Sequence, residues 1–219
     1  MMRFRALVLF VLLPAGLGRA VPPVGDEAPR DEFSAAITPE SFDARRLARA
    51  IFAETNRVRR GLELDELMPS DEADAAASIQ ASLGYMPGLV PHTNPFYGVA
   101  TLAERVQRVG LSAVRAGENA ARLPIIDTRG QDHFGYKVED GVKLAVDLET
   151  GERFGPHTYA SCAADFVRRW MKSPGHRENL LSRNFRVLGC AVQLMRYDDF
   201  DQIYAVQVFI TPRPSKKRG

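Results

Sequence analysis

The clearest hydrophobic pattern in the chain lies around residues 163–171, where apolar side chains recur at helical spacing. They fall at positions i, i+3, i+4, i+7 and i+8 and form one stripe, comprising Ala163, Phe166, Val167, Trp170 and Met171. This period predicts an amphipathic helix with one buried face. Pro174 ends the helix at Ser173, because the residue before a proline is driven out of helical geometry. His176 and Arg177 are then predicted in a loop between this helix and a short helical turn.

Three further helices are predicted upstream. An apolar face at helical spacing runs from Ala44 to Val58 and ends at Gly61. An alanine-rich helix begins near Ser70, with acidic residues in its first turn, where they suit the helix dipole. A shorter helix opens at Thr101, where the sequence Thr-x-x-Glu is a capping box.

Two strands are predicted near the end of the chain, over residues 185–194 and 202–210. The second is apolar on both faces, so the sheet is expected to be covered on both sides. The simplest architecture is an α+β fold, a three-layer α/β/α sandwich around a mainly antiparallel sheet. Residues 124–160 interrupt this plan. Asp140-Gly141 between two strand-like segments predicts an inserted β-hairpin there.

The first residues resemble an export signal. Two arginines precede an apolar run and small residues follow it, so residues 1–20 are predicted to be a signal peptide cleaved near Ala20. Residues 21–39 are rich in proline, glycine and acids, which is typical of a disordered linker. The folded domain is expected over residues 40–212, followed by a basic tail at 213–219.

The charge balance excludes nucleic acid as a general partner. The predicted signal contains three of the 29 basic residues and none of the 27 acidic ones, so the exported chain has 26 against 27 and carries about −1. We expect a secreted or periplasmic monomer that does not span a membrane. Export also makes the compartment oxidising, so Cys162 and Cys190 either pair in a disulfide or remain two small buried side chains.

Polar chemistry is concentrated in His92, Glu118 and His176. Two imidazoles and a carboxylate suit a divalent metal, or acid–base work with a water molecule. Each residue also has an ordinary alternative as an exposed loop residue, a turn-holding carboxylate or a helix cap. The sequence contains no nucleophile elbow, no H-E-x-x-H, no P-loop and no dinucleotide fingerprint.

Several motifs occur in one order along the chain. They are Asn56-x-x-x-Arg60-Gly61-Leu62, His92-Thr93-Asn94-Pro95, R-A-G-E-N-A-A at 115–121, W-M-K-S-P-G-H-R-E-N-L-L at 170–181, and Leu188-Gly189. In these motifs the chain resembles the CAP superfamily of cysteine-rich secretory, antigen-five and pathogenesis-related proteins, in its bacterial exported form with an SCP domain. The resemblance covers residues 40–212 except 124–160. It implies an α/β/α sandwich with a central cleft.

The family site is a tetrad of two histidines and two acids that binds Zn²⁺ or a similar ion in some members. The resemblance implies that His92, Glu118 and His176 are three of the four, while Ser173 replaces the second acid. A His₂Glu set has the ligand count of a zinc site with an open position, with His92 and His176 as ligands together with Glu118. No second carboxylate is near in sequence to act as a base. Asn119, Ser173 and Arg177 are the further candidates for ligand contact.

Three functions remain open. In the first, the cleft of a secreted binding module takes a small molecule, lipid, peptide or envelope component, and no cofactor is required. In the second, the same residues form a metal-assisted hydrolase, with His92, Glu118 and His176 as the candidate catalytic residues. In the third, the polar residues only hold loops together. The missing acid and the absence of a nucleophile motif favour binding or structure over an enzyme.

Overall fold

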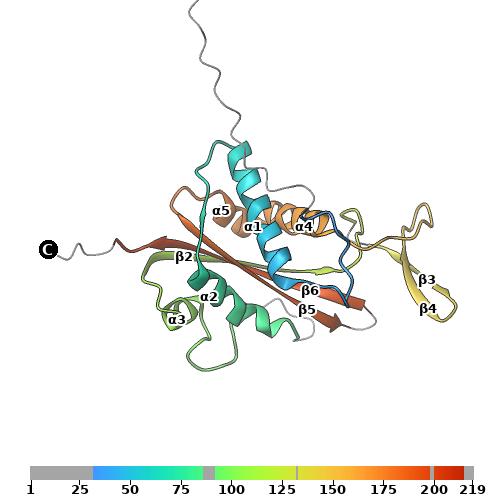
Figure 1. The fold of residues 1–219 in the computed structure, drawn as a ribbon, viewed down its shortest axis with the longest axis horizontal. Helices are drawn as coiled ribbons and strands as arrows, with labels where there is room; N and C mark the ends of the chain where they lie inside the picture. Colours follow the sequence, from blue (N-terminus) through green and yellow to red (C-terminus); the bar gives the residue numbers. More distant parts are fainter. Residues whose placement is uncertain (1–31, 86–91, 132, 198–199, 215–219) are drawn as a thin grey trace, which may run out of the picture.

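The centre of the molecule is a four-stranded sheet in the order β1-β5-β6-β2 (Figure 1). This computed structural model describes residues 32–85, 92–131, 133–197 and 200–214. The strands are β1 (Met68–Pro69), β2 (Ala113–Pro124), β5 (Val187–Tyr197) and β6 (Phe200–Pro212). β6 pairs antiparallel with β5 and β2, and the short β1 runs parallel to β5. The predicted, mainly antiparallel sheet is confirmed.

Helices cover both faces of this sheet. On one side lie α1 (Ala44–Gly61), α4 (Tyr159–Lys172) and α5 (Pro174–Leu181), and on the other α2 (Asp71–Ala81), the 3₁₀ turn Ser82–Tyr85 and α3 (Leu102–Arg108). The alternation along β6 explains the two layers. Ile203, Ala205 and Phe209 pack with α1 and α4, whereas the intervening Tyr204, Val206 and Val208 pack with α2. The three-layer α/β/α sandwich is therefore confirmed.

The predicted apolar stripe is the buried face of α4. Phe166 and Trp170 are 0% and 1% exposed, and their ring centroids lie 5.5 Å apart. Thr158 caps the helix by accepting a hydrogen bond from the Ser161 amide. Met171, the last member of the stripe, is only half-buried.

The predicted loop around His176 and Arg177 is wrong. α5 begins directly at Pro174, so His176 lies in the first turn of a helix. Ser173 is extended and ends α4 while opening α5. Proline is favoured at the first helical position, because its missing N–H has no partner there and its φ is already helical. The proline thus separates two helices rather than opening a loop.

β5 packs tightly against α2 at Gly189. A Cβ at this position would overlap the backbone of Ala73 and Asp74, and Asp74 Oδ1 accepts a 2.7 Å hydrogen bond from the amide of Cys190. Backbone atoms cannot move aside as a flexible side chain can, so only glycine fits.

We expect Gly189→Ala to lower the free energy of unfolding by about 3 kcal/mol, because overpacking forces α2 away from the sheet. Urea denaturation of the purified chain measures this loss. The matched control is Gly61→Ala, where a Cβ meets nothing within 4 Å. If the two variants are equally stable, α2 does not pack this closely on the sheet.

The predicted insertion is a two-stranded hairpin, β3 (Gly135–Glu139) and β4 (Val142–Val146), that projects from the body (Figure 1). Asp140 and Gly141 have φ of 51° and 77°, as a two-residue type I′ turn requires. At the base of the insertion, Ile126 bridges Pro156. The hairpin prediction is confirmed.

The linker predicted over residues 21–39 is wrong from Glu32 onward. Ile37 is fully buried in the core, and its amide donates a 2.7 Å hydrogen bond to the carbonyl of His157. The remainder of this linker, the predicted signal peptide and residues 215–219 of the basic tail lie outside the described residues. Within the described residues, no helix is long and apolar enough to cross a membrane.

The two cysteines are not joined. Cys162 and Cys190 are both free and buried. Burial raises the pKa of each thiol well above its ordinary value, so both are neutral side chains of the core.

Candidate functional site

Three of the predicted site residues meet at one place in the fold. His92 lies before α3, Glu118 lies on β2 and His176 lies in the first turn of α5. The imidazole centroids of His92 and His176 are 5.9 Å apart, with the rings tilted by 53°. His92 Nδ1 lies 3.0 Å from Glu118 Oε1. Residues that are far apart in sequence thus form one polar cluster.

Glu118 is held by an arginine that the sequence analysis missed. Arg105 Nη2 donates a 2.5 Å hydrogen bond to Glu118 Oε2, and the two side chains are 0% and 4% exposed. Arg105 also donates to the carbonyl oxygens of Val99 and Ala100. The sequence contained a signal, since Arg105 falls at helical spacing between the apolar Leu102 of α3 and Val109, which caps the helix. A charge on an apolar stripe indicates a buried partner.

The two imidazoles differ in basicity. The hydrogen bond to Glu118 raises the pKa of His92 above its usual value, with burial opposing the effect. Burial lowers the pKa of His176, and the neighbouring His92 lowers it further. His92 therefore keeps its proton to higher pH, while His176 is a neutral imidazole with a lone pair to offer.

This difference predicts a pH dependence. A raised pKa in the folded state gives a stabilisation that is complete below the unfolded value of about 6.5 and is lost as pH rises through the folded pKa of His92. We expect the stability difference between the wild type and His92→Gln to be largest at low pH and to shrink above neutrality. Urea unfolding across this range measures it. A difference that grows with pH would contradict the assignment.

Asn119 lies beneath the site rather than in it. Its side chain is fully buried, and Nδ2 donates to the carbonyl oxygen of His176 at 3.2 Å and to Gln207 Oε1 at 3.3 Å. Asn179 donates to Asn119 Oδ1 and to the carbonyl oxygen of Glu118 at 2.9 and 3.1 Å. The amide of Asn119 is thus engaged by protein groups, and its contact with a ligand stays a prediction. Asn119 and Asn179 fix α5 against β2, which sets the position of His176.

Ser173 and Arg177 lie outside the hydrogen bonds of the cluster. Ser173 is half-buried at the junction of α4 and α5, and Arg177 is exposed. Within the described part of the chain, neither makes a hydrogen bond to His92, Glu118 or His176. Their contact with a ligand stays a prediction.

A model of the cysteine-rich secretory protein (CAP) family matches residues 52–209. This match spans most of the chain and includes every residue of the polar cluster. The chain belongs to the CAP family. No protein with a curated description matches it in sequence.

Several solved structures are similar to this chain at low identity. An extracellular SCP-domain protein of Bacillus anthracis is 24% identical over 81% of this chain with a TM-score of 0.48, and this chain spans only 45% of its length. An outer surface protein of Borrelia burgdorferi is 18% identical over 78% of this chain and 97% of its own, with a TM-score of 0.50. The CAP domain of enterococcal PrgA is 14% identical over 86% of this chain and 72% of its own, with a TM-score of 0.48. The Borrelia protein supports the fold and nothing about activity.

In this CAP domain, His92 and His176 could hold an ion between them, but Glu118 is not free to act as a third ligand. Both oxygens of Glu118 are engaged, one by His92 and one by Arg105. A carboxylate that binds one ring nitrogen of a histidine orients the other toward a metal. The ring centroids of His92 and His176 lie 5.9 Å apart, and an ion held between them would lie about 2.1 Å from one nitrogen of each ring. Glu118 would orient His92 rather than bind the ion.

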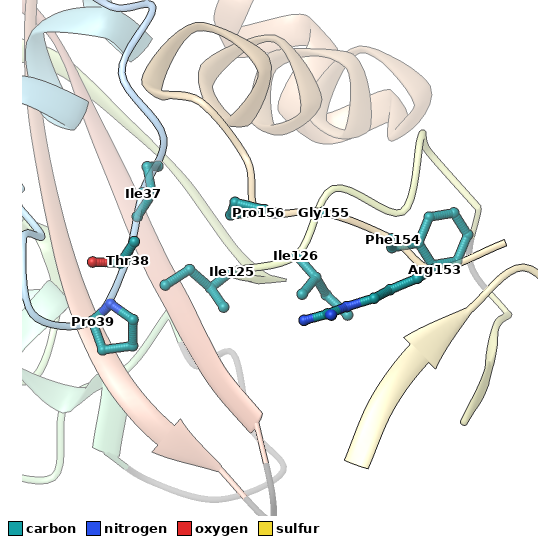
Figure 2. Close-up of a pocket in the computed structure, with 9 residues that line it drawn as sticks. All are labelled: Ile37, Thr38, Pro39, Ile125, Ile126, Arg153, Phe154, Gly155 and Pro156. Atoms are coloured by element: carbon teal, nitrogen blue, oxygen red, sulfur yellow. The ribbon is translucent and has the colours of Figure 1, made fainter. Parts of the chain in front are cut away.

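A cavity lies away from this CAP site. Residues 37–39, 125–126 and 153–156 line a hollow of about 350 Å³ (Figure 2). Its walls come from the segment before α1 and from the base of the insertion, and they include none of the three cluster residues. The insertion therefore shapes a separate hollow.

Proposed function

We propose that the chain is an exported CAP-domain binding protein whose cluster of His92, Glu118 and His176 recognises the polar group of a small molecule, lipid or peptide of the cell envelope. The observation that carries this proposal is the relay from Arg105 through Glu118 to His92. The His92 side chain is 54% exposed, and it is held in place by Glu118 and Arg105, whose side chains are almost fully buried. An exposed polar group held this rigidly costs little entropy when it binds a ligand.

The chemistry of the two rings favours an acidic ligand group. With Nδ1 engaged by Glu118, His92 has Nε2 left to donate when the ring is protonated. A charged donor forms a stronger hydrogen bond to a carboxylate or phosphate than to a neutral oxygen. His176, the less basic ring, supplies an acceptor beside it.

A metal-assisted hydrolase is the second candidate, and the 5.9 Å separation of the two rings supports it. An ion on His92 and His176 would lower the pKa of a bound water when present. A hydrolase also needs a base that positions this water, and the two positions where the family would supply one do not offer a free carboxylate. Ser173 stands where the family has its second acid, and Glu118 is committed to Arg105. Binding is therefore the better-supported function.

Ligand capture tests the proposal. The exported chain is incubated with an envelope extract, and bound small molecules are identified by mass spectrometry. We expect His92→Ala and His176→Ala to retain less than a tenth of the ligand that the wild type holds, because each removes a polar contact. The control is His133→Ala, which changes an exposed histidine of the insertion. Equal recovery from all four proteins would refute the binding site.

Calorimetry with Zn²⁺ and hydrolysis assays on peptide, ester and glycan substrates separate the alternatives. Micromolar zinc affinity lost in both cluster variants, together with zinc-dependent turnover, would support the hydrolase. Absence of ligand and of zinc binding, with a large drop in melting temperature in both variants, would show that the cluster only holds the fold together.

A further inference from the structure

A second group of polar side chains lies where the insertion returns to α4. Asp127 follows β2, His157 precedes the cap of α4, and Asp165 lies in α4 itself. One ligand atom from each residue lies within 4.8 Å of the other two. The His157 side chain is 1% exposed, against 31% for Asp127 and 15% for Asp165. This group shares no residue with the cluster around His92.

In each aspartate, one carboxylate oxygen accepts a hydrogen bond from another residue, and the other oxygen faces the imidazole of His157. Asp127 Oδ1 accepts from the amide of Arg129 at 2.9 Å, and Asp165 Oδ1 accepts from Arg168 Nη2 at 2.8 Å. Asp127 Oδ2 lies 3.6 Å from His157 Nδ1, and Asp165 Oδ2 lies 3.9 Å from Nε2. Both distances exceed a hydrogen bond. The two carboxylates thus approach the ring at its two different nitrogens, and neither is hydrogen-bonded to it, while one ligand atom of each residue still lies within 4.8 Å of the other two.

The imidazole is itself oriented by a neighbour. His157 Nδ1 lies 2.9 Å from Ser161 Oγ, and the Ser161 hydroxyl accepts from the amide of Thr158. Histidines that bind metals are usually fixed by such a contact through the second ring nitrogen. Burial also lowers the pKa of His157, which keeps the ring neutral and able to donate a lone pair.

The geometry points to a divalent cation site formed by Asp127, His157 and Asp165, which takes a transition ion such as Zn²⁺ or Mn²⁺. One imidazole nitrogen and two carboxylate oxygens are a ligand set that these ions accept, whereas Ca²⁺ prefers oxygen alone. Two carboxylates against the single guanidinium of Arg168 leave a net negative charge for the ion to offset. Closing the ligand atoms around an ion requires a small rotation of Asp127, the most exposed of the three.

Such an ion would fix the base of the insertion. Asp127 and His157 lie at its two ends, and Asp165 belongs to the helix beneath. Binding would join the ends of a 31-residue segment to α4, and a link that closes a long loop stabilises the folded state. The role assigned to the ion is therefore structural and independent of ligand binding at His92.

The alternative occupant of the space is a proton. His157 in its protonated form could pair with both carboxylates and would then need no ion. A bound ion and a protonated His157 make different predictions for a chain that lacks His92 and His176. Such a chain still binds a metal in the first case and binds none in the second.

The experiment uses the full chain carrying His92→Ala and His176→Ala, stripped of metal with EDTA and titrated with Zn²⁺ and with Mn²⁺ by calorimetry. We expect one ion per chain and a rise in melting temperature of several degrees with the ion. Adding Asp127→Asn should weaken binding at least tenfold and remove the rise. Asp127 is partly exposed, so this variant is expected to fold, which circular dichroism verifies.

Glu152→Gln is the matched control, since it removes an exposed carboxylate of the same insertion that pairs with Arg129. It should leave the affinity unchanged. Absence of an ion in the His92→Ala, His176→Ala chain, or equal affinity with and without Asp127→Asn, overturns the site. Failure of ligand capture at His92 would leave this result unaffected.

Discussion

Replacing Arg105 by methionine is expected to lower the free energy of unfolding by about 3–5 kcal/mol. The substitution leaves the Glu118 carboxylate buried, at 4% exposure, with only the partly exposed His92 as a charged partner. Burial disfavours an unpaired charge strongly, and methionine fills most of the volume, so the loss reports the charge rather than a cavity. Urea denaturation at neutral pH measures it.

A double-mutant cycle separates the pair from its parts. Glu118→Gln alone leaves the Arg105 guanidinium, which is fully buried, without its carboxylate and should cost a similar amount. The double variant should be more stable than the sum of the two losses implies, by about 2 kcal/mol, because neither charge is then unpaired. Simple additivity would show that Arg105 and Glu118 do not interact.

The Glu118→Gln variant also tests the candidate site directly, through the pKa of His92. The pKa of His92 is raised chiefly by its hydrogen bond to Glu118. In Glu118→Gln the carboxylate is gone, so the pKa of His92 should fall toward or below its ordinary value, as followed by NMR of the imidazole protons. An unchanged His92 titration would contradict the relay on which the proposed binding function rests.

The parts of this fold that were predictable are those that local sequence determines. The helical period of α4, the two apolar faces of β6 and the Asp140-Gly141 turn each depend on neighbouring residues, and each was found. The burial of Ile37 was not found. Ile37 lies close to Phe33, Ala35 and Ala36, but the segment that precedes them is rich in proline, glycine and acids, and averaging composition over the whole of residues 21–39 hides the apolar end.

The site was predictable in its members but not in their roles. The family motifs identified His92, Glu118 and His176, and the fold brings these three side chains together. That Asn119 turns inward to hold α5 depends on Asn179, a partner 60 residues away. The grouping of Asp127, His157 and Asp165 likewise joins separate segments. Such contacts follow from tertiary packing, which one sequence does not display.

Trp170→Ala is expected to lower the free energy of unfolding by about 3–5 kcal/mol, because it empties a large volume in the centre of the layer formed by α1 and α4. Trp170 is 1% exposed and stacks against Phe166. Neighbouring helices cannot collapse into the space, since α4 is fixed at one end by the cap at Thr158 and at the other by the start of α5 at Pro174.

Trp170→Phe separates volume from hydrogen bonding. Within the described residues, Trp170 Nε1 has no hydrogen-bond partner, so replacing the indole by a benzyl group removes a buried polar atom together with some apolar surface. The two effects oppose each other, and we expect a loss of only about 1 kcal/mol. Denaturation of both variants in urea provides the comparison. A neutral alanine variant would show that the tryptophan face of α4 is not the centre of the core, and the position assigned to His176 beyond it would lose its support.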